Sequence, residues 1–165
     1  GWPFGAYRYT EVLGPRLLSV PVVIGCAWVV LAAYVRQMAL RVGVGRAAGI
    51  GIAAAWMTAI DFVIDPLAAN GLGYWRWEEA GIYYGIPATN FAGWYLVSVL
   101  IFATDRVLGS EWKRNRWAEW IGLSILLFFT LIAVASKLTL AAAIGAGLLS
   151  CQAALIGFKI KSPAL

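Results

Sequence analysis

The sequence contains no histidine, only two cysteines and few charged residues for its length. Charged residues make up 13% of the 165 positions, whereas 62% are hydrophobic. The lack of histidine excludes Ser-His-Asp catalysis, haem ligation by imidazole and most zinc chemistry. Cys26 and Cys151 are single residues inside apolar runs. In that setting a cysteine usually behaves as a small buried hydrophobic residue, so the pair carries no information on the redox compartment.

Long apolar runs account for most of the chain. Five of them reach the ~20 residues that a helix needs to cross a membrane. The charged residues gather between the runs and do not cover one face of each helix, as a soluble bundle would require. We therefore predict an all-α fold, a polytopic bundle of about five transmembrane helices that forms a single domain over residues 1–165. The predicted spans are 17–35, 47–69, 87–104, 120–136 and 138–158.

The basic residues favour one orientation of these spans. One set of loops carries nine of them, namely Arg36, Arg41, Arg46, Arg106, Lys113, Arg114, Arg116, Lys159 and Lys161. The opposite side carries four, namely Arg8, Arg16, Arg76 and Lys137. By the positive-inside rule the first set is cytoplasmic, and segments 1–16 and 70–86 lie on the outer side. The same loops explain the net charge of +5. We expect a multi-pass protein of a prokaryotic cell membrane that does not bind nucleic acid.

The second predicted span contains two carboxylates, Asp61 and Asp65, in otherwise apolar surroundings. Their spacing places both on one face of a helix, with Cβ atoms roughly 6 Å apart. Ionisable groups within a span are costly and mark functional sites by default. Two such carboxylates can share one proton near neutral pH and serve as acid and base. The alternative is that Asp65 lies at the outer interface, where Pro66 ends or kinks the helix and water reaches the carboxylate.

The outer segment before the third span is rich in aromatic residues. Eight of the chain's 23 aromatic residues lie between Gly73 and Tyr95. An interfacial belt accounts for part of them. The others can line a groove for a long apolar molecule or face a transient cation. Asn90 adds an uncharged donor and acceptor at the start of the third span, and Glu11 adds a third carboxylate on the same side as Asp65.

Several motifs carry a specific resemblance to a known family. They are Pro3-Phe4-Gly5-x-Tyr7-x-Tyr9, Trp28, Asp61-x-x-Ile64-Asp65-Pro66, Trp75-x-Trp77, Gly81-x-Tyr83-Tyr84-Gly85-Ile86-Pro87 and Asn90-Phe91-x-Gly93-Trp94. In these positions the chain resembles the membrane carotenoid biosynthesis family that includes the carotenoid 1,2-hydratases and the bisanhydrobacterioruberin hydratases. The resemblance covers residues 1 to about 105 well, and the last two spans by hydropathy alone. Members usually carry further helices before the Pro-Phe-Gly segment, so we expect an N-terminally incomplete member.

The resemblance implies the addition of water across the terminal C1=C2 bond of an acyclic carotenoid end group, without cofactor or metal ion, to give a tertiary alcohol. The expected partners are the carotenoid, water and the lipid bilayer. The reaction needs an acid that protonates C2, surroundings that tolerate a tertiary cation at C1, and a base or an oriented water. We expect Asp61 to be the acid and Asp65 to tune it or to orient the water, and swapped roles are almost as credible. Asn90 and Glu11 are expected as polar helpers. The aromatic residues expected to bind the substrate are Tyr7, Tyr9, Trp28, Trp75, Trp77, Tyr83, Tyr84, Phe91 and Trp94.

Two other functions fit part of this pattern. Asp61 and Asp65 could form one of the Asp-rich motifs with which UbiA-type membrane prenyltransferases bind a Mg²⁺-diphosphate. Those proteins need two such motifs and about nine helices, whereas this sequence predicts one motif and five helices. A non-enzymatic carotenoid- or lipid-binding protein is the third hypothesis.

Overall fold

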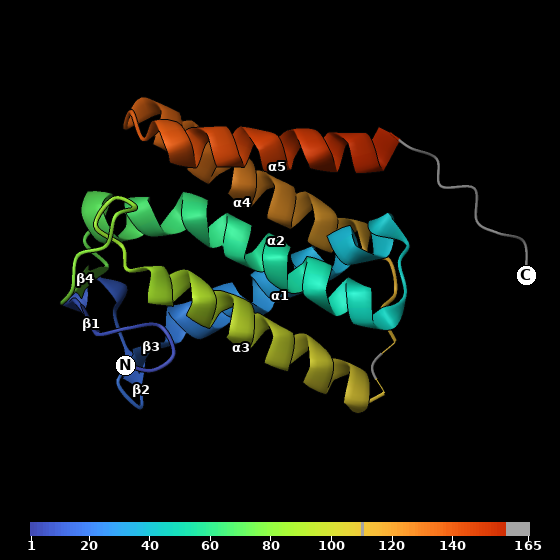
Figure 1. Cartoon of the computed structure of the whole chain (residues 1–165), viewed down its shortest axis with the longest axis horizontal. Coiled ribbons are helices and arrows are strands. Elements are labelled where there is room, and N and C mark those ends of the chain that lie inside the picture. Colours follow the sequence, from blue (N-terminus) through green and yellow to red (C-terminus); the bar gives the residue numbers. More distant parts are fainter. Residues whose placement is uncertain (110, 158–165) are drawn as a thin grey trace, which may run out of the picture.

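The computed structural model describes residues 1–109 and 111–157, and its main elements are five long helices with a small β structure at one end (Figure 1). The helices are α1 Val22–Val42, α2 Arg46–Pro66, α3 Ala88–Val107, α4 Arg116–Ala135 and α5 Thr139–Gly157. The predicted all-α class and the number of helices are therefore confirmed. Phe158 at the end of the last predicted span, and Lys159 and Lys161 of the predicted cytoplasmic set, lie outside the described residues.

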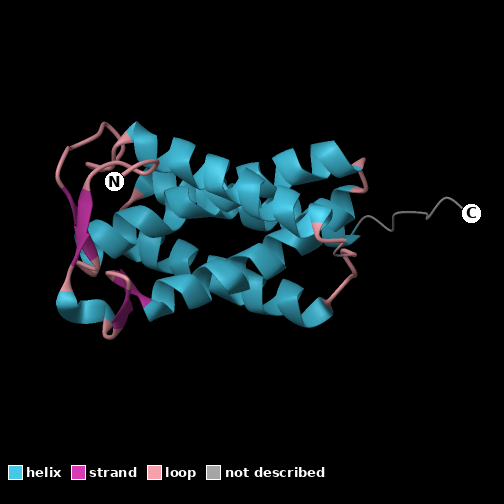
Figure 2. Cartoon of the chain, turned by 90° about the horizontal axis from the view of Figure 1, so that it is seen from below, coloured by secondary structure: helices cyan, strands magenta, loops and turns pink. Residues whose placement is uncertain are grey.

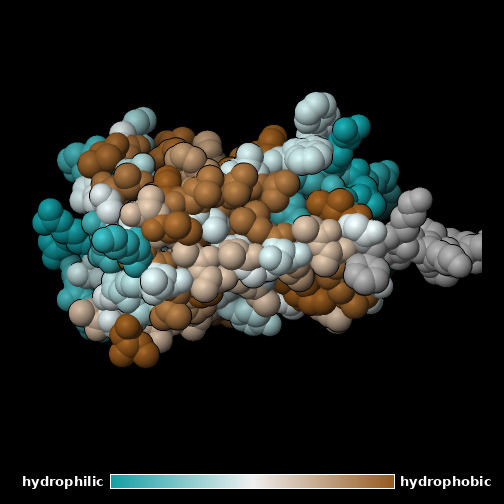
Figure 3. Space-filling view, turned by 90° about the horizontal axis from the view of Figure 1, so that it is seen from above, coloured by the Kyte–Doolittle hydropathy of each residue, from teal (hydrophilic) through white to brown (hydrophobic). Residues whose placement is uncertain are grey.

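Four of the five helices are long and apolar enough to cross a membrane. They are α1, α2 together with the turn that continues it to Gly71, α4 and α5. Helix α3 has a similar length, but Asn90, Ser98 and Asp105 make it more polar, and it is not in this set of four. Figure 3 shows hydrophilic surface at the two ends of the molecule and a band of apolar surface between them. This distribution matches a helix bundle that faces lipid along its middle.

Two short β ribbons at one end of the bundle were not predicted from the apolar runs (Figure 2). Strand β1 (Tyr7–Tyr9) pairs antiparallel with β4 (Trp75–Trp77), and β2 (Arg16–Leu17) pairs with β3 (Val20–Pro21). A short 3-10 helix, η1 (Glu11–Leu13), lies between β1 and β2. Because residues 16–21 form the second ribbon, the first long helix begins at Val22 and not at residue 17 as predicted.

The register of the β1–β4 ribbon sorts its side chains onto two faces. Tyr7 lies opposite Trp77, and Tyr9 lies opposite Trp75. Side chains alternate between the faces of a strand, so these aromatic residues share one face and the arginines at positions 8 and 76 share the other. The aromatic side chains are half-buried and the arginines are exposed. The ribbon therefore turns its aromatic face toward the bundle.

The helical path of α2 does not stop abruptly at its proline. The α-helix runs to Pro66, and the chain then makes a wider π-helical turn, η2 (Leu67–Gly71), in which Leu72 N donates to Leu67 O at 2.8 Å. Proline cannot donate a backbone hydrogen bond, which favours a change of helical geometry here. Since Pro66 is the last α-helical residue, Asp65 still lies on the same helix face as Asp61.

At the opposite end of the bundle, a buried ion pair that was not predicted from the sequence joins α1 to α4. Arg41 donates from Nε to Glu119 Oε1 at 2.9 Å and from Nη2 to Oε2 at 2.6 Å, and both side chains are only 9% exposed. The prediction that Arg36 and Arg41 lie in a loop is thus wrong, because α1 extends past Val35 to Val42. The same correction applies to three more of the predicted loop residues, which lie in the end turns of helices: Arg46, Arg106 and Arg116. Removing one partner of a buried ion pair leaves an uncompensated buried charge, which is strongly destabilising.

The loops fall into the two groups that the predicted topology requires. The N-terminal segment, the ribbons, the loop before α3 and the α4–α5 turn lie at one end, and the α1–α2 turn and the α3–α4 loop lie at the other (Figure 1). The last two helices form an antiparallel hairpin, with only residues 136–138 between them. Which end faces the cytoplasm stays a prediction.

The first testable prediction concerns the close approach of α1 and α4 at Gly122. A Cβ atom added at Gly122 would lie 1.9 Å from Cγ of Tyr34, a side chain with no exposed surface. Because the Tyr34 side chain is enclosed on all sides, Gly122→Ala should lower the free energy of unfolding by ~1–3 kcal/mol. The midpoint of thermal unfolding of the detergent-solubilised protein measures this loss.

The matched control is Gly147→Ala in α5, where an added Cβ meets nothing within 4 Å. This substitution should leave the unfolding midpoint unchanged or raise it slightly, because alanine favours helix over glycine. Equal shifts in the two variants would contradict the packing of α1 against α4 at this position.

Candidate active site

Two buried carboxylates and one amide form the polar centre of the molecule. Asp61 and Asp65 are each 1% exposed on the same face of α2, and Asn90 in the first turn of α3 is 3% exposed. Asn90 Nδ2 donates to Asp61 Oδ2 and to Asp65 Oδ2, both at 2.7 Å. A single amide group therefore bridges the two carboxylates, which fixes their separation.

The β1–β4 ribbon supplies a further hydrogen bond to this centre. Trp75 Nε1 donates to Asp65 Oδ1 at 2.7 Å. Both oxygens of Asp65 thus accept a hydrogen bond, whereas Oδ1 of Asp61 accepts none from the described residues. The burial of Asp65 also contradicts the alternative in which this carboxylate lies open to water at the interface.

The loop before α3 sets the position of Asn90. Pro87 is in an extended conformation directly before α3, and Asn90 N donates to Pro87 O at 3.0 Å. The loop folds back tightly at Gly81, where an added Cβ would lie 1.9 Å from Ile86 O. Ile86 is itself buried. A glycine and a buried isoleucine thus hold the loop in the shape that directs Asn90 toward α2.

The three polar residues lie in the wall of an apolar cavity of about 670 Å³. Its lining comes from the N-terminal segment, β4 and helices α1 to α4, and is dominated by aromatic and aliphatic side chains. An apolar cavity with a few convergent polar groups is the usual form of a small-molecule site. Of the predicted substrate-binding residues the cavity is lined by Tyr7, Tyr9, Trp28, Trp75, Trp77 and Trp94.

These aromatic residues pack against one another around the cavity. Trp28 of α1 and Trp94 of α3 stack with their ring centroids 4.1 Å apart. The hydroxyl groups of Tyr7 and Tyr9 lie 3.3 Å apart, and Tyr9 meets Trp75 edge to face. Burial, together with the hydrogen bond to Tyr7, raises the pKa of the Tyr9 hydroxyl. Tyr9 therefore stays a neutral phenol near the polar centre.

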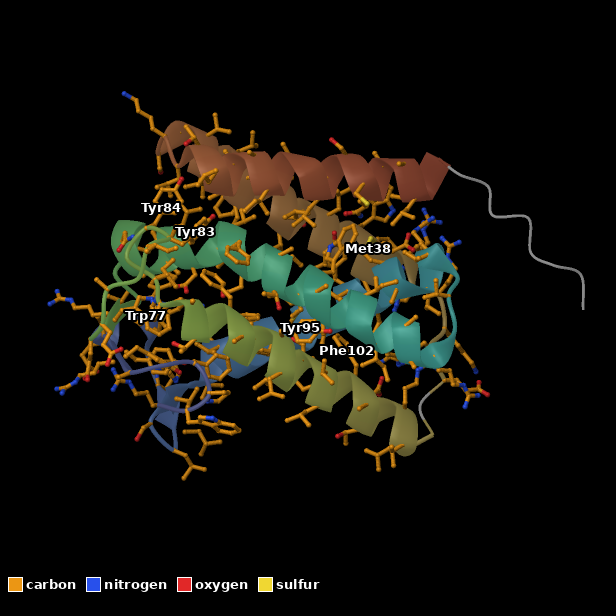
Figure 4. All side chains as sticks on the ribbon, viewed as in Figure 1. Met38, Trp77, Tyr83, Tyr84, Tyr95 and Phe102 are labelled. Carbon is orange, nitrogen blue, oxygen red and sulfur yellow. The ribbon has the colours of Figure 1, made fainter. Side chains whose placement is uncertain are left out.

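The three other predicted aromatic residues lie outside the cavity lining. Phe91 stacks on Phe62 with ring centroids 3.7 Å apart, and the Tyr83 hydroxyl donates to Phe62 O at 2.9 Å. Burial raises the pKa of the Tyr83 hydroxyl. The Tyr84 hydroxyl accepts from Leu140 N at 3.0 Å, which ties the loop to the start of α5. Figure 4 places Tyr83 and Tyr84 near the end of α2, away from Trp77.

Glu11 is not brought to the cavity. Its side chain is 91% exposed and pairs with Arg16, whose Nη2 lies 2.9 Å from Glu11 Oε1. Arg16 also donates to the backbone oxygen of Thr10 at 2.8 Å. Glu11 is therefore paired within the N-terminal segment and makes no contact with Asp61 or Asp65 among the described hydrogen bonds.

Sequence reasoning missed the contributions of α1 and α4. Beyond Trp28, α1 lines the cavity with a run of small and aliphatic side chains that includes Ile24, Cys26 and Ala27, and α4 adds Ile125 and Phe129. None of these residues belongs to a polar or aromatic motif. They line the cavity because their helices lie beside α2 and α3, which hydropathy alone does not reveal.

Comparison with known proteins gives two matches. The sequence model of the family described as carotenoid biosynthesis protein matches residues 1–155. A bisanhydrobacterioruberin hydratase of Haloarcula japonica is 34% identical over 110 residues, which are 62% of this chain and 37% of that protein. The chain thus spans well under two thirds of this relative's length. No solved structure matches.

The second prediction concerns the contact of the N-terminal segment with α3. A Cβ added at Gly93 would lie 2.8 Å from Phe4 Cδ1 and 3.0 Å from the backbone of Pro3. Gly93→Val should therefore displace this segment from α3 and expose the adjoining chain to protease. Limited trypsin digestion after Arg8, an exposed residue, should become several-fold faster.

Gly51→Val is the control, because the nearest described atom to an added Cβ there is the Tyr95 hydroxyl at 3.8 Å. A glycine-to-valine change at that position carries the same helix-propensity effect without the contact. An unchanged cleavage rate after Arg8 in Gly93→Val would refute the close packing of the N-terminal segment on α3.

Proposed function

Since the chain belongs to the carotenoid biosynthesis protein family, we propose that it adds water across the terminal C1=C2 double bond of an acyclic carotenoid end group. The observation that carries this proposal is the pair of buried carboxylates in the wall of an apolar, aromatic cavity. An isoprenoid end group needs apolar walls, and its hydration needs an acid and a base placed close together. The hydratase name of the Haloarcula japonica relative supports the same reaction. The product is a tertiary alcohol.

Asp61 is the acid in this proposal. Hydrogen bonds donated to a carboxylate favour its ionised form, and Asp65 accepts two of them whereas Asp61 accepts one. The proton shared by the pair therefore resides on Asp61, and its Oδ1 is free to deliver it to the substrate. Protonation of C2 breaks the π bond, forms a C2–H bond and leaves a tertiary cation at C1.

Asp65 is the base that completes the addition. A water molecule attacks C1 and forms the C–O bond, and its proton passes to the ionised Asp65. The proton then returns from Asp65 to Asp61 through a cavity water, and Asn90 keeps the two carboxylates at a fixed distance during this exchange. One water is consumed and no electrons are transferred, so the cycle needs no redox partner.

The aromatic lining supports the cationic intermediate. The faces of indole and phenol rings attract cations, and tryptophan does so most strongly. The tryptophans at positions 28, 75, 77 and 94 line the cavity together with Tyr7 and Tyr9. They offer π faces to the cation at C1. The same surfaces bind the flat polyene chain behind the reacting end group.

The prenyltransferase alternative is less well supported. A diphosphate carries several negative charges, and no lysine or arginine is among the described residues that line the cavity. Addition of Mg²⁺ and a prenyl diphosphate discriminates between the two enzymes, because a hydratase uses neither. A binding protein without activity would need the apolar cavity but not the bridged pair of carboxylates.

The third prediction is that Asp61→Asn abolishes hydration. The substitution keeps the shape of the side chain but removes the acidic proton, and general acids contribute about 10²–10⁴-fold to rate. Wild type and variant are expressed in a bacterial host that accumulates lycopene, and products heavier by one or two waters are quantified by liquid chromatography with mass detection. A loss of at least about 100-fold is expected at equal amounts of membrane-bound protein.

Glu79→Gln is the matched control, because Glu79 is exposed at the same end of the molecule and does not line the cavity. It should give as much hydrated product as wild type. Hydration that survives in Asp61→Asn would remove Asp61 as the acid, and lycopene binding without any hydrated product in wild type would favour the binding protein.

The fourth prediction assigns Trp75 a positioning role through Asp65. Trp75→Phe keeps an aromatic ring in the cavity but removes the donor to Asp65 Oδ1. The ionised form of Asp65 is then less favoured, so the rate of hydration should begin to fall at a higher pH than in wild type as the pH is lowered. The pH dependence of initial rates with detergent-solubilised protein measures this shift.

Trp94→Phe is the comparison, because Trp94 lines the cavity and donates no described hydrogen bond to either carboxylate. This variant should change the apparent KM without moving the acidic limb of the profile. Identical pH profiles for Trp75→Phe and wild type would show that the indole donor does not act through Asp65.

A further inference from the structure

A second cavity lies at the opposite end of the bundle from the carboxylates. It has a volume of about 450 Å³ and is formed by α1, the loop before α4 and the first turn of α4. Four basic residues and one acidic residue contribute to its lining. The lining residues are Ala33, Arg36, Gln37, Glu111, Lys113, Arg114, Asn115, Arg116 and Ala118.

The acidic groups nearby do not offset the positive charge of this cavity. Glu111 pairs with Lys113 at 3.2 Å, but both side chains are about four-fifths exposed, where such a pair is weak. Arg114 reaches Glu119 at 3.3 Å, yet both oxygens of that carboxylate are already bound by Arg41. Arg36 is held by Asp105 at 3.6 Å. The lining therefore has an excess of cations over anions.

The α4 N-terminus adds to this field. Arg116 is the first residue of α4, so the backbone N–H groups of that turn carry partial positive charge. The Asn115 side chain already accepts from the backbone N–H groups of residues 117 and 118 at 3.0 and 3.4 Å. The attraction for an anion therefore rests mainly on the guanidinium and ammonium groups.

Exposed apolar residues on α1 and α4 lie next to this cavity. Val29 lies one turn before Ala33 on α1 and is 71% exposed, and Ile121 lies one turn after Ala118 on α4 and is 50% exposed. The next residues along the two helices, Val30 and Ile125, already line the large cavity. Residues three or four apart share a helix face, so Val29 lies on the face of α1 that carries Ala33, and Ile121 lies on the face of α4 that carries Ala118.

The level of the basic cavity corresponds to a membrane interface. Trp117 and Trp120 on the first turns of α4 are 70% and 56% exposed. Exposed tryptophans of this kind gather at the headgroup level of a bilayer. Basic pockets between membrane helices at that level bind phosphate-bearing lipid headgroups.

We propose that the basic cavity binds the phosphate group of an anionic phospholipid whose acyl chain lies against the exposed apolar residues of α1 and α4 beside it. The cations of the cavity take the phosphate, and Val29 and Ile121 contact the chain. This proposal does not depend on the hydratase reaction, and it gives the basic loop a ligand beyond its role in topology.

The test measures lipid binding to the purified full chain by native mass spectrometry. Phosphatidylglycerol is compared with phosphatidylcholine of the same acyl chains, and inorganic phosphate is tested alone. Phosphatidylglycerol should bind at least about tenfold more tightly than phosphatidylcholine. The double variant Lys113→Gln with Arg116→Gln should bind phosphatidylglycerol about thirtyfold more weakly, because each cation near a membrane surface contributes roughly fivefold to the affinity.

Two controls separate a headgroup site from general charge. Arg8→Gln with Arg76→Gln removes the same charge from the opposite end and should keep the affinity for phosphatidylglycerol. Val29→Asn retains every cation and should weaken phosphatidylglycerol binding without affecting inorganic phosphate. Binding is compared only for variants whose unfolding midpoint is close to that of wild type.

Equal affinity for the two phospholipids would overturn the proposal, and so would equal losses in the two double variants. Binding of inorganic phosphate as tightly as phosphatidylglycerol would show a free-anion site without a lipid chain. Loss of hydratase activity has no bearing on these outcomes, so the two proposals fail separately.

Discussion

The burial of two carboxylates against apolar helices is the constraint on which the rest of the structure depends. A carboxylate taken out of water is costly unless hydrogen bonds replace its hydration, and two adjacent carboxylates repel each other when both are ionised. Asn90 meets both demands, because its amide group donates to Asp61 and to Asp65 at once. Trp75 supplies the further donor that Asp65 needs. The pair thus requires groups from α3 and from the β1–β4 ribbon in addition to its own helix.

Much of the surrounding architecture brings these donors to α2. The register of β1 and β4 directs Trp75 inward, and the absence of a side chain at Gly93 lets the N-terminal segment lie against α3. The tight loop at Gly81 orients the start of α3 and so places Asn90. At the far end, the pair of Arg41 and Glu119 holds α1 against α4, the two helices that supply the apolar wall of the cavity. The site is therefore assembled from segments far apart in the chain.

The sequence was sufficient to predict the helical class, the five helices and the closeness of Asp61 and Asp65, because hydropathy and helical spacing are local properties. It also identified Asn90. Of the nine aromatic residues that were expected at the site, six line the cavity. The β ribbons were missed because their strands have only two or three residues each, too short for a periodic signal. Glu11 was assigned to the site only because it is predicted on the same side of the membrane as Asp65. In the structure its partner is Arg16. The burial of Arg41 could not be foreseen, since its partner lies 78 residues away.

The hydration mechanism requires that an acid with a solvent-exchangeable proton protonates C2 and that water supplies the new oxygen at C1. Isotope labelling tests it directly, with lycopene and the detergent-solubilised chain incubated separately in H₂¹⁸O and in D₂O and the products analysed by mass spectrometry. One ¹⁸O in the new hydroxyl group and one deuterium at C2 are expected for each water added. An unlabelled hydroxyl oxygen, or a product without deuterium at C2, would contradict this mechanism.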